Sequence, residues 1–376
     1  MDKERFRQLR KQVLQELEQQ TDLRESRIAD TVQRVVAQKE RETGFTFADW
    51  KEAEEALYNS LKRLDVIEGL MQDEEVTEVM INGPDHIFYE KKGCLYPFGE
   101  SFESEQRLRE IIDQIVGEHN RRVNTRMPIV DTRLKDGSRV HIVLEPISLQ
   151  GPVVTIRKFQ KDVMNLAFLV SNGTMSQQEA DYLKHLVQQK QTILISGGTG
   201  SGKTTLLNAL SAAISQQERV ITIEDSAELR LQNSPNLIRL ECRDANGEGA
   251  PAVTIRDLIR ASLRMRPDRL LIGEVRGPEA LDLLQALNTG HQGSLSTLHA
   301  NTCKDTFSRL ETMMLMAMDL PLKAIRAQIA SGIQDIVHVK KYPDGSRKLD
   351  EIIHVDGIRG EDIQYHSVYK RGEETS

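Results

Sequence analysis

The chain has 376 residues, of which 39% are hydrophobic and 28% are charged. This length suggests two or three domains of about 150 residues. The absence of any run of about 18 apolar residues argues against a transmembrane helix, and the charged N-terminus lacks the apolar core of a secretory signal. The net charge of −7 argues weakly against nucleic acid as the main partner, because nucleic-acid-binding domains are usually net basic.

The first 60 residues are predicted to be helical. They contain one glycine and no proline, and apolar side chains recur at helical spacing in three stripes. The stripes are Phe6, Leu9, Val13 and Leu17, then Ile28, Val32, Val35 and Val36, then Phe47, Trp50, Ala53, Leu57 and Leu61. The simplest interpretation of residues 1–60 is a small helical bundle, and a docking arm for another protein is the alternative.

A small α/β domain is predicted over residues 61–156, followed by a linker over 157–163. A helix that Ser104 would cap interrupts short β-like runs. These runs cover residues 75–81, 86–92, 94–98, 130–134, 139–144 and 153–159.

Residues 164–376 are predicted to form the second domain. Three short apolar runs, at 192–196, 220–225 and 269–275, alternate with helical segments, which favours a parallel sheet covered by helices. Ser176 would cap a helix running through Lys190, and Pro321 would open a late helix. Two hairpin-like segments around residues 343–345 follow.

The strongest motif lies directly after the apolar run at 192–196. Residues 197–204 read GGTGSGKT and match the pattern G-x-x-x-x-G-K-[ST] before a helix. Such a loop points backbone N–H groups at phosphate oxygens, so Lys203 would reach the β- and γ-phosphates and Thr204 would bind Mg²⁺. The expected nucleotide contacts are Gly198, Thr199, Gly200, Ser201, Gly202, Lys203, Thr204 and Thr205.

Acidic residues end the other two apolar runs. Glu274 occupies the position of a Walker B acid, but Gly273 stands where an aspartate usually precedes it. Glu274 is therefore the carboxylate expected to hold Mg²⁺ through water. Glu224 and Asp225 close the run at 220–225, where a carboxylate could deprotonate the attacking water. A helix-start cap is the alternative for this pair.

The segment at 289–301, TGHQGSLSTLHAN, combines glycines, hydroxyl side chains and two histidines downstream of Glu274. Such a composition suits a sensor of the γ-phosphate. Another unusual group is Met313, Met314, Met316 and Met318, which would form either an adaptable partner surface or, as the simpler interpretation, a buried helix face.

In this order, GGTGSGKTT, IEDSAEL, LRMRPDRLLIGEVRG and TGHQGSLSTLHANT resemble the Walker A, Asp box, Walker B and His box of the type II/type IV secretion ATPase superfamily. The segments EVTEVMINGP, VDTRLKDGSRVHIV and GPVVTIRKF also match. The resemblance covers residues from about 60 to 370. It is greatest to the CpaF (TadA-type) branch, which drives Flp or tight-adherence pili.

The resemblance implies an α/β fold with a PAS-like N-terminal domain and a RecA-like ATPase domain. It further implies a cytoplasmic homohexamer at the inner face of the membrane, where it uses ATP and Mg²⁺ and works on a platform protein. Glu224 would be the general base, Glu274 the Mg²⁺-linked acid and His299 the sensor. Zinc is not expected, because the cysteines Cys94, Cys242 and Cys303 form no tetracysteine module.

Arg133 and Arg139 match N-terminal arginines that, in this superfamily, reach the nucleotide phosphates. Weaker candidates are Arg157, Arg264, Arg266 and Arg276. A two-residue turn at residues 136–137 would place Arg133 and Arg139 on opposite faces of a hairpin, and a three-residue turn would place them on one face. The sequence leaves this open, and an arginine in a hairpin is often simply solvated.

Two other functions compete with a secretion motor. A RecA-like nucleic acid translocase would share the P-loop and the Walker B strand, but it would need a basic track that the net charge does not favour. A nucleotide-gated scaffold without hydrolysis would lack the lysine or the base, and both are present here as Lys203 and Glu224.

Overall fold

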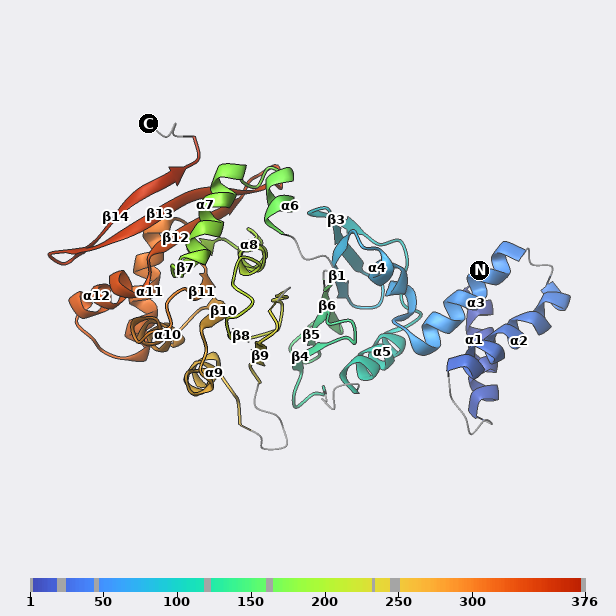
Figure 1. Ribbon diagram of the computed structural model, residues 1–376. Coiled ribbons are helices and arrows are strands. Elements are labelled where there is room, and N and C mark those ends of the chain that lie inside the picture. Colours follow the sequence, from blue (N-terminus) through green and yellow to red (C-terminus); the bar gives the residue numbers. More distant parts are fainter. Residues whose placement is uncertain are drawn as a thin grey trace. The chain divides into compact units, whose positions relative to one another are not determined.

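The computed structural model describes residues 3–18, 25–43, 47–117, 123–159, 165–231, 234–243 and 251–372. The chain divides into two compact units, Met1–Lys161 and Asp162–Ser376, which are described separately below (Figure 1). Part of the predicted linker, residues 160–163, lies outside the described residues.

The first unit begins with three helices, α1 (Lys3–Glu18), α2 (Glu25–Thr43) and α3 (Phe47–Lys62). Their apolar stripes pack against one another in a common core, as a helical bundle requires. The buried members are Leu9, Val13, Leu17, Ile28, Val32, Val35, Val36, Ala53 and Leu57. The side chains of Phe6, Phe47 and Trp50, which were assigned to the same stripes, lie outside the described residues.

A six-stranded antiparallel sheet forms the rest of the first unit. Its strands, in spatial order β3-β2-β1-β6-β5-β4, are β1 (Val76–Asn82), β2 (Ile87–Lys91), β3 (Cys94–Pro97), β4 (Ile129–Arg133), β5 (Arg139–Val143) and β6 (Val153–Arg157). The short helices η1 (Asp65–Ile67) and α4 (Glu68–Gln72) and the longer α5 (Glu105–Gly117) share one apolar core with the sheet. Ser104 caps α5 as predicted, since its hydroxyl accepts the N–H of Arg107 at 3.1 Å.

The second unit is built on an eight-stranded sheet of order β14-β13-β12-β7-β11-β10-β8-β9. The strands are β7 (Ile193–Gly197), β8 (Val220–Glu224), β9 (Leu237–Glu241), β10 (Arg269–Val275), β11 (Leu295–Leu298), β12 (Asp335–Lys341), β13 (Arg347–Arg359) and β14 (Asp362–Lys370). Strands β12 to β9 in this order run parallel, and β13 and β14 are antiparallel. The three predicted strands are confirmed, while β9 and β11 were not predicted.

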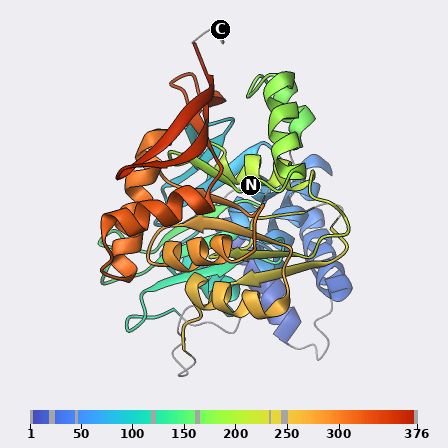
Figure 2. The ribbon, with the colours of Figure 1, turned by 60° about the vertical axis from the view of Figure 1, so that its left-hand side comes forward.

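Helices cover both faces of this sheet (Figure 2). On one face lie α6 (Leu166–Ser171), α7 (Gln177–Gln188) and α8 (Lys203–Ser211), and on the other lie α9 (Ile255–Ser262), η2 (Leu263–Met265), α10 (Glu279–Asn288), α11 (Cys303–Ala317) and α12 (Leu322–Gly332). Ser176 caps α7 in a capping box. The prediction that α7 continues to Lys190 is wrong, because Lys190 has a φ of 58° and the helix has already ended.

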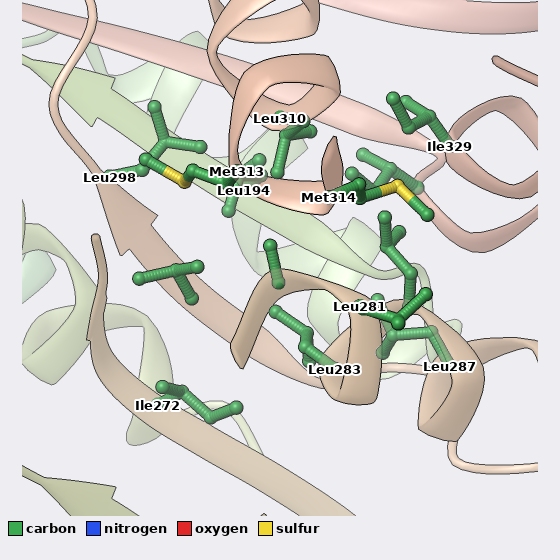
Figure 3. Packing of buried hydrophobic residues seen from close by; sticks show 14 of the residues in the cluster. Leu194, Ile272, Leu281, Leu283, Leu287, Leu298, Leu310, Met313, Met314 and Ile329 are labelled. Atoms are coloured by element: carbon green, nitrogen blue, oxygen red, sulfur yellow. The ribbon is translucent and has the colours of Figure 1, made fainter. Parts of the chain in front are cut away.

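The methionine-rich segment divides between core and surface. Met313 and Met314 are buried between α11, α10 and the sheet, as Figure 3 shows. Met316 and Met318 are 63% and 51% exposed. The prediction of a buried helix face therefore holds for the first pair and is wrong for the second, because Met316 lies on the solvent side of α11 and Met318 follows the helix, which ends at Ala317.

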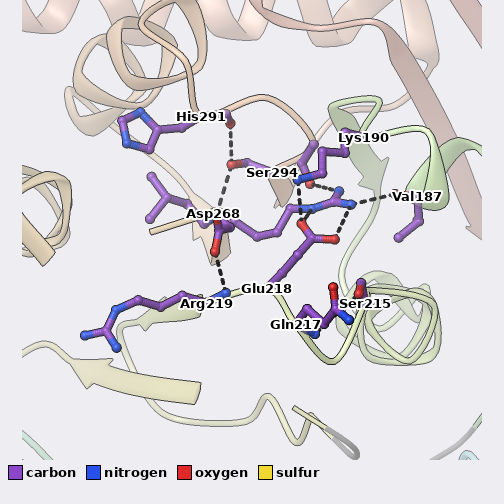
Figure 4. A network of polar contacts seen from close by, with 12 residues as sticks. Val187, Lys190, Ser215, Gln217, Glu218, Arg219, Asp268, His291 and Ser294 are labelled. Atoms are coloured by element: carbon purple, nitrogen blue, oxygen red, sulfur yellow. Dashed lines mark hydrogen bonds and ion pairs between the residues drawn. The ribbon is translucent and has the colours of Figure 1, made fainter. Parts of the chain in front are cut away.

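A buried arginine joins the segments just before β8 and β11 to the end of α7. The guanidinium of Arg269, at the start of β10, donates to Glu218 at 2.6 Å and to the carbonyls of Gly293 and Val187 at 2.6 and 2.8 Å. Lys190 lies 3.2 Å from the same Glu218 carboxylate, and Figure 4 shows Glu218, Lys190 and Val187 around this position. A buried charge must be paired and hydrogen-bonded, and this one is.

Replacing this arginine tests the anchor. Arg269→Met leaves Glu218 buried with Lys190 as its remaining cation, so the second unit should lose about 3–5 kcal/mol of stability. Urea unfolding of the full chain, followed by circular dichroism, measures the loss. The single tryptophan, Trp50, belongs to the first unit, so the urea midpoint that its fluorescence reports should not change.

The matched control is Arg109→Gln, which removes a part-exposed arginine from its pairs with Glu105 and Glu145. Such a pair contributes at most about 1 kcal/mol. An Arg269→Met variant as stable as this control would contradict the anchoring role.

Candidate functional site

The loop between β7 and α8 requires glycine at its start. A Cβ on Gly197 would lie 2.3 Å from the carbonyl oxygen of Val339 and 2.5 Å from the hydroxyl of Ser201. Gly202 has a φ of 96° and begins α8 from a left-handed conformation. The backbone at these two positions therefore excludes other residues, and the loop leads directly into the N-terminus of a helix, where anions are favoured.

Lys203, His299 and Glu274 form one chain of contacts at the ends of neighbouring strands. The ammonium of Lys203 donates to the carbonyls of Gly197 and Gly198 at 3.1 and 2.9 Å, and lies 3.4 Å from Nδ1 of His299. Nε2 of His299 lies 2.8 Å from Oε1 of Glu274, which is an ion-pair distance without the alignment of a hydrogen bond. Because Nδ1 of His299 faces the Lys203 ammonium and can only accept from it, the contacts suit a neutral imidazole that carries its proton on Nε2.

The charge states in this chain agree with that assignment. Burial lowers the pKa of His299, and the nearby Lys203 ammonium lowers it further. Burial also lowers the pKa of Lys203, which Glu274 partly counteracts. The strand order explains why Lys203, His299 and Glu274 lie together: β7, β11 and β10 are neighbours and end at the same edge of the sheet. The structure thus brings together three of the predicted site residues.

Glu224 ends β8 in a different environment. Glu224 is 2% exposed, and its Oε2 accepts the N–H groups of Glu228 and Leu229 at 2.7 and 2.8 Å. Oε1 is buried and has no hydrogen-bond partner among the described residues. Burial raises the pKa of Glu224 to about 7, although the two N–H groups act to lower it.

The glycine that departs from the Walker B pattern has a steric reason. Gly273 lies beside Glu224 in adjacent parallel strands, and a Cβ on Gly273 would lie 3.1 Å from Cγ of Glu224. A side chain here would press on the buried carboxyl. The carbonyl of Gly273 also accepts the hydroxyl of Thr297 at 2.7 Å, which ties β11 to β10.

Two further arginines contact this edge of the sheet. Arg347, which begins β13, donates through Nε to the carbonyl of Gly200 at 2.8 Å, and it was not identified from the sequence. The available signal was topological: β12 pairs with β7 in parallel, so the turn after β12 must lie beside the P-loop. Arg276, one of the weaker candidates, contacts Glu274.

In the first unit, the hairpin β4–β5 resolves the question of the turn. Arg133 pairs directly with Arg139, and the N–H of Gly137 donates to the carbonyl of Leu134 at 2.9 Å. The loop therefore has three residues, with Gly137 in a left-handed conformation at φ 92°. Arg133 and Arg139 consequently lie on one face of the sheet.

A third arginine extends this pair into a row. Arg157 on β6 pairs with Arg139 and also with Glu78 on β1. The opposite face of these strands carries the buried residues of the core, so the row lies on the face that α4 and α5 do not cover. Arg264 and Arg266, the remaining candidates, lie in the second unit, in and just after η2, and both are exposed.

Comparison with known proteins places the chain in a family. Residues 60–343 match the model of the "Type II/IV secretion system protein" family. The type IV secretion system protein PtlH of Bordetella pertussis is 32% identical over 311 residues, covering 76% of this chain and 92% of PtlH. The conjugal transfer protein TrbB of Rhizobium radiobacter is 30% identical over 298 residues, covering 78% and 88%.

A solved structure supports the same fold. The pilus retraction motor PilT, in a crystal structure with bound ADP, superposes with a TM-score of 0.56 and 20% identity over 77% of this chain and 82% of PilT. The chain has the two-domain α/β architecture with a RecA-like second unit, as predicted. No helix within the described ranges has the length and apolar character that spanning a membrane requires. The chain belongs to the type II/IV secretion system protein family.

Proposed function

We propose that the chain hydrolyses ATP to ADP and phosphate and that this reaction drives a secretion or pilus machine. The observation that supports the proposal most strongly is the edge of the second sheet. There a glycine-rich loop, the ammonium of Lys203 and the carboxylates of Glu274 and Glu224 follow neighbouring strands. Phosphoryl transfer needs mainly such positioning and charge stabilisation.

The donors at this edge fit a Mg²⁺–nucleotide. Mg²⁺ prefers oxygen ligands, and Thr204 and Glu274 supply a hydroxyl and a carboxylate. The hydroxyl of Ser201 is buried in the loop without a hydrogen-bond partner among the described residues. Thr204 and Glu274 are the residues proposed to hold the ion, Glu274 through water, and the ion would neutralise phosphate charge.

Glu224 is the proposed general base. A base works best when its pKa lies near the working pH, and burial raises the pKa of Glu224 to about 7. Oε1 would take a proton from the attacking water as the water oxygen bonds to the γ-phosphorus and the bond to the ADP oxygen breaks. His299, which contacts both Lys203 and Glu274, is the proposed sensor of the γ-phosphate.

The wider assembly is also part of the proposal. PtlH and TrbB are named as parts of type IV secretion and conjugal transfer, and the motifs of this chain resemble the CpaF branch. We therefore propose a homohexamer at the inner face of the membrane that acts on a platform protein of a Flp/Tad-like pilus or of a secretion system. Arg133 and Arg139 would close over the nucleotide phosphates, from the same chain or from a neighbour.

Substitution of two residues tests the hydrolytic site. Lys203→Ala should lose Mg²⁺–ATP hydrolysis, because the lysine offsets phosphate charge, whereas Lys184→Ala on the exposed side of α7 should not. Glu224→Gln should bind ATP but hydrolyse it about 10²–10⁴-fold more slowly. A fast Glu224→Gln with a dead Glu274→Gln would mean that the roles of the two acids are reversed. Stimulation of the rate by DNA or RNA would favour the translocase.

The protonation of Glu224 gives a separate test without nucleotide. Because its folded pKa is raised above the ordinary 4.5, the native state holds a proton that the unfolded state has lost between pH 4.5 and 7, so stability falls as pH rises through that window. Glu224→Gln keeps an oxygen for the two N–H groups and removes the charge. At pH 8 the free energy of unfolding of Glu224→Gln should exceed that of the wild type by up to about 3 kcal/mol, and the two values should become equal by pH 5. Thermal unfolding across this pH range measures the difference. A gap that is independent of pH would contradict the raised pKa.

The arginine pair and the ring are tested together. Arg133→Ala with Arg139→Ala should lose turnover far more than ATP binding, since transition-state arginines supply about 10³–10⁵-fold in rate. Arg109→Ala on α5, in the same unit, is the control. If a ring is required, specific activity should rise with protein concentration and level off as hexamers form. Flat activity from a monomer would refute the ring, and full turnover in the double variant would refute the arginines.

A further inference from the structure

Arg276 contacts carboxylates that follow two different strands. Its Nε and one terminal nitrogen donate to the same oxygen of Glu274, Oε2, at 2.8 and 2.6 Å. The other terminal nitrogen lies 3.4 Å from Oδ2 of Asp225. Glu274 belongs to β10, whereas Asp225 directly follows β8. The guanidinium therefore bridges the proposed metal-linked acid to the segment after β8.

The backbone of Arg276 is held in place while its side chain is exposed. Oε1 of Glu279 accepts the N–H groups of Arg276 and Gly277 at 2.6 and 2.8 Å, which secures the turn before α10. The side chain of Arg276 is 60% exposed and that of Glu274 is 16% exposed. The guanidinium can therefore change partners by rotating its side chain, without movement of the strand.

The segment that Arg276 reaches is the one that positions the proposed base. Asp225 begins the stretch whose N–H groups, at Glu228 and Leu229, hold Oε2 of Glu224. Glu228 also contributes to the negative potential around the guanidinium, and with Glu274 and Asp225 it raises the pKa of Arg276. A second acidic location is thus available to Arg276 if it leaves Glu274.

We propose that Arg276 is a latch that competes with the Mg²⁺–nucleotide for Glu274 and, once released, pairs with Asp225. In the latched arrangement both oxygens of Glu274 are in contact with protein nitrogens, and the guanidinium charge opposes a second cation at that carboxylate. Release strengthens the contact to the segment after β8 and so links occupancy of Glu274 to the placement of Glu224. This inference rests on the proposed function.

The test measures the Mg²⁺ concentration needed for binding of a fluorescent ADP derivative, mant-ADP, to the full chain. Arg276→Gln should lower the half-saturating Mg²⁺ concentration about 5-fold, the size that an exposed ion pair can supply. Asp225→Asn should raise it, because Arg276 then keeps Glu274 as its nearest carboxylate. The double variant, Arg276→Gln with Asp225→Asn, should have the same half-saturating Mg²⁺ concentration as Arg276→Gln alone, because Asp225 acts only through Arg276.

Arg326→Gln is the matched control, because Arg326 also pairs with two carboxylates, Glu311 and Asp362, and it should leave the Mg²⁺ dependence unchanged. If Arg276→Gln does not fold, Arg276→Lys serves, since a single ammonium cannot reproduce the guanidinium's paired contact. The half-saturating Mg²⁺ concentration of Arg276→Lys should lie between the wild-type value and the roughly 5-fold lower value expected when Arg276 no longer holds Glu274.

The outcomes separate the latch from the proposed function. An unchanged or higher Mg²⁺ requirement in Arg276→Gln, or equal shifts in both single variants, would overturn the latch while leaving nucleotide binding intact. Wild-type protein that binds no mant-ADP at any Mg²⁺ concentration, or Lys203→Ala that binds it normally, would overturn the proposed function itself.

Discussion

One buried guanidinium anchors the sheet at the edge opposite the candidate site. Arg269 holds the chain just before β8, just before β11 and at the end of α7, while it begins β10 itself. Hydrogen-bonded strands cannot slide past one another without breaking many bonds together. Securing where these strands begin therefore determines where they end, and their far ends carry Glu224, Glu274 and His299. The placement of these three side chains thus depends on a contact at the opposite edge of the sheet.

The two carboxylates at the far edge differ because of what surrounds them. Glu274 is in contact with the guanidinium of Arg276 and the imidazole of His299, whereas Glu224 is buried and accepts two backbone N–H groups. Burial accordingly raises the pKa of Glu224 to about 7, and two glutamates in different surroundings can take different roles in catalysis. Gly273 allows this division, since it leaves space for Glu224 between the strands.

Much of this arrangement could be predicted from the sequence, because apolar runs and glycine patterns are local signals. The P-loop, β7, β8 and β10 were predicted in this way. Strand β11 was missed since its inward groups include hydroxyls, which are satisfied by β10 carbonyls across the sheet. Arg347 was missed because its contact with Gly200 joins residues 147 positions apart. The sequence of a hairpin does not show which face of the sheet a given arginine will lie on, because that depends on the length of the turn. Only the register of β4 and β5 shows that Arg133 and Arg139 lie on the same face.

The three-residue loop of the β4–β5 hairpin has an evolutionary consequence. Side chains alternate along a strand, so removing one loop residue would shift the pairing and turn one of the two arginines toward the core. Replacing Lys135 or Asp136 by another residue leaves the alternation intact. The proposed role of the two arginines therefore depends on the length of this loop more than on the identity of Lys135 or Asp136, so a one-residue insertion or deletion there should be tolerated less well than a substitution.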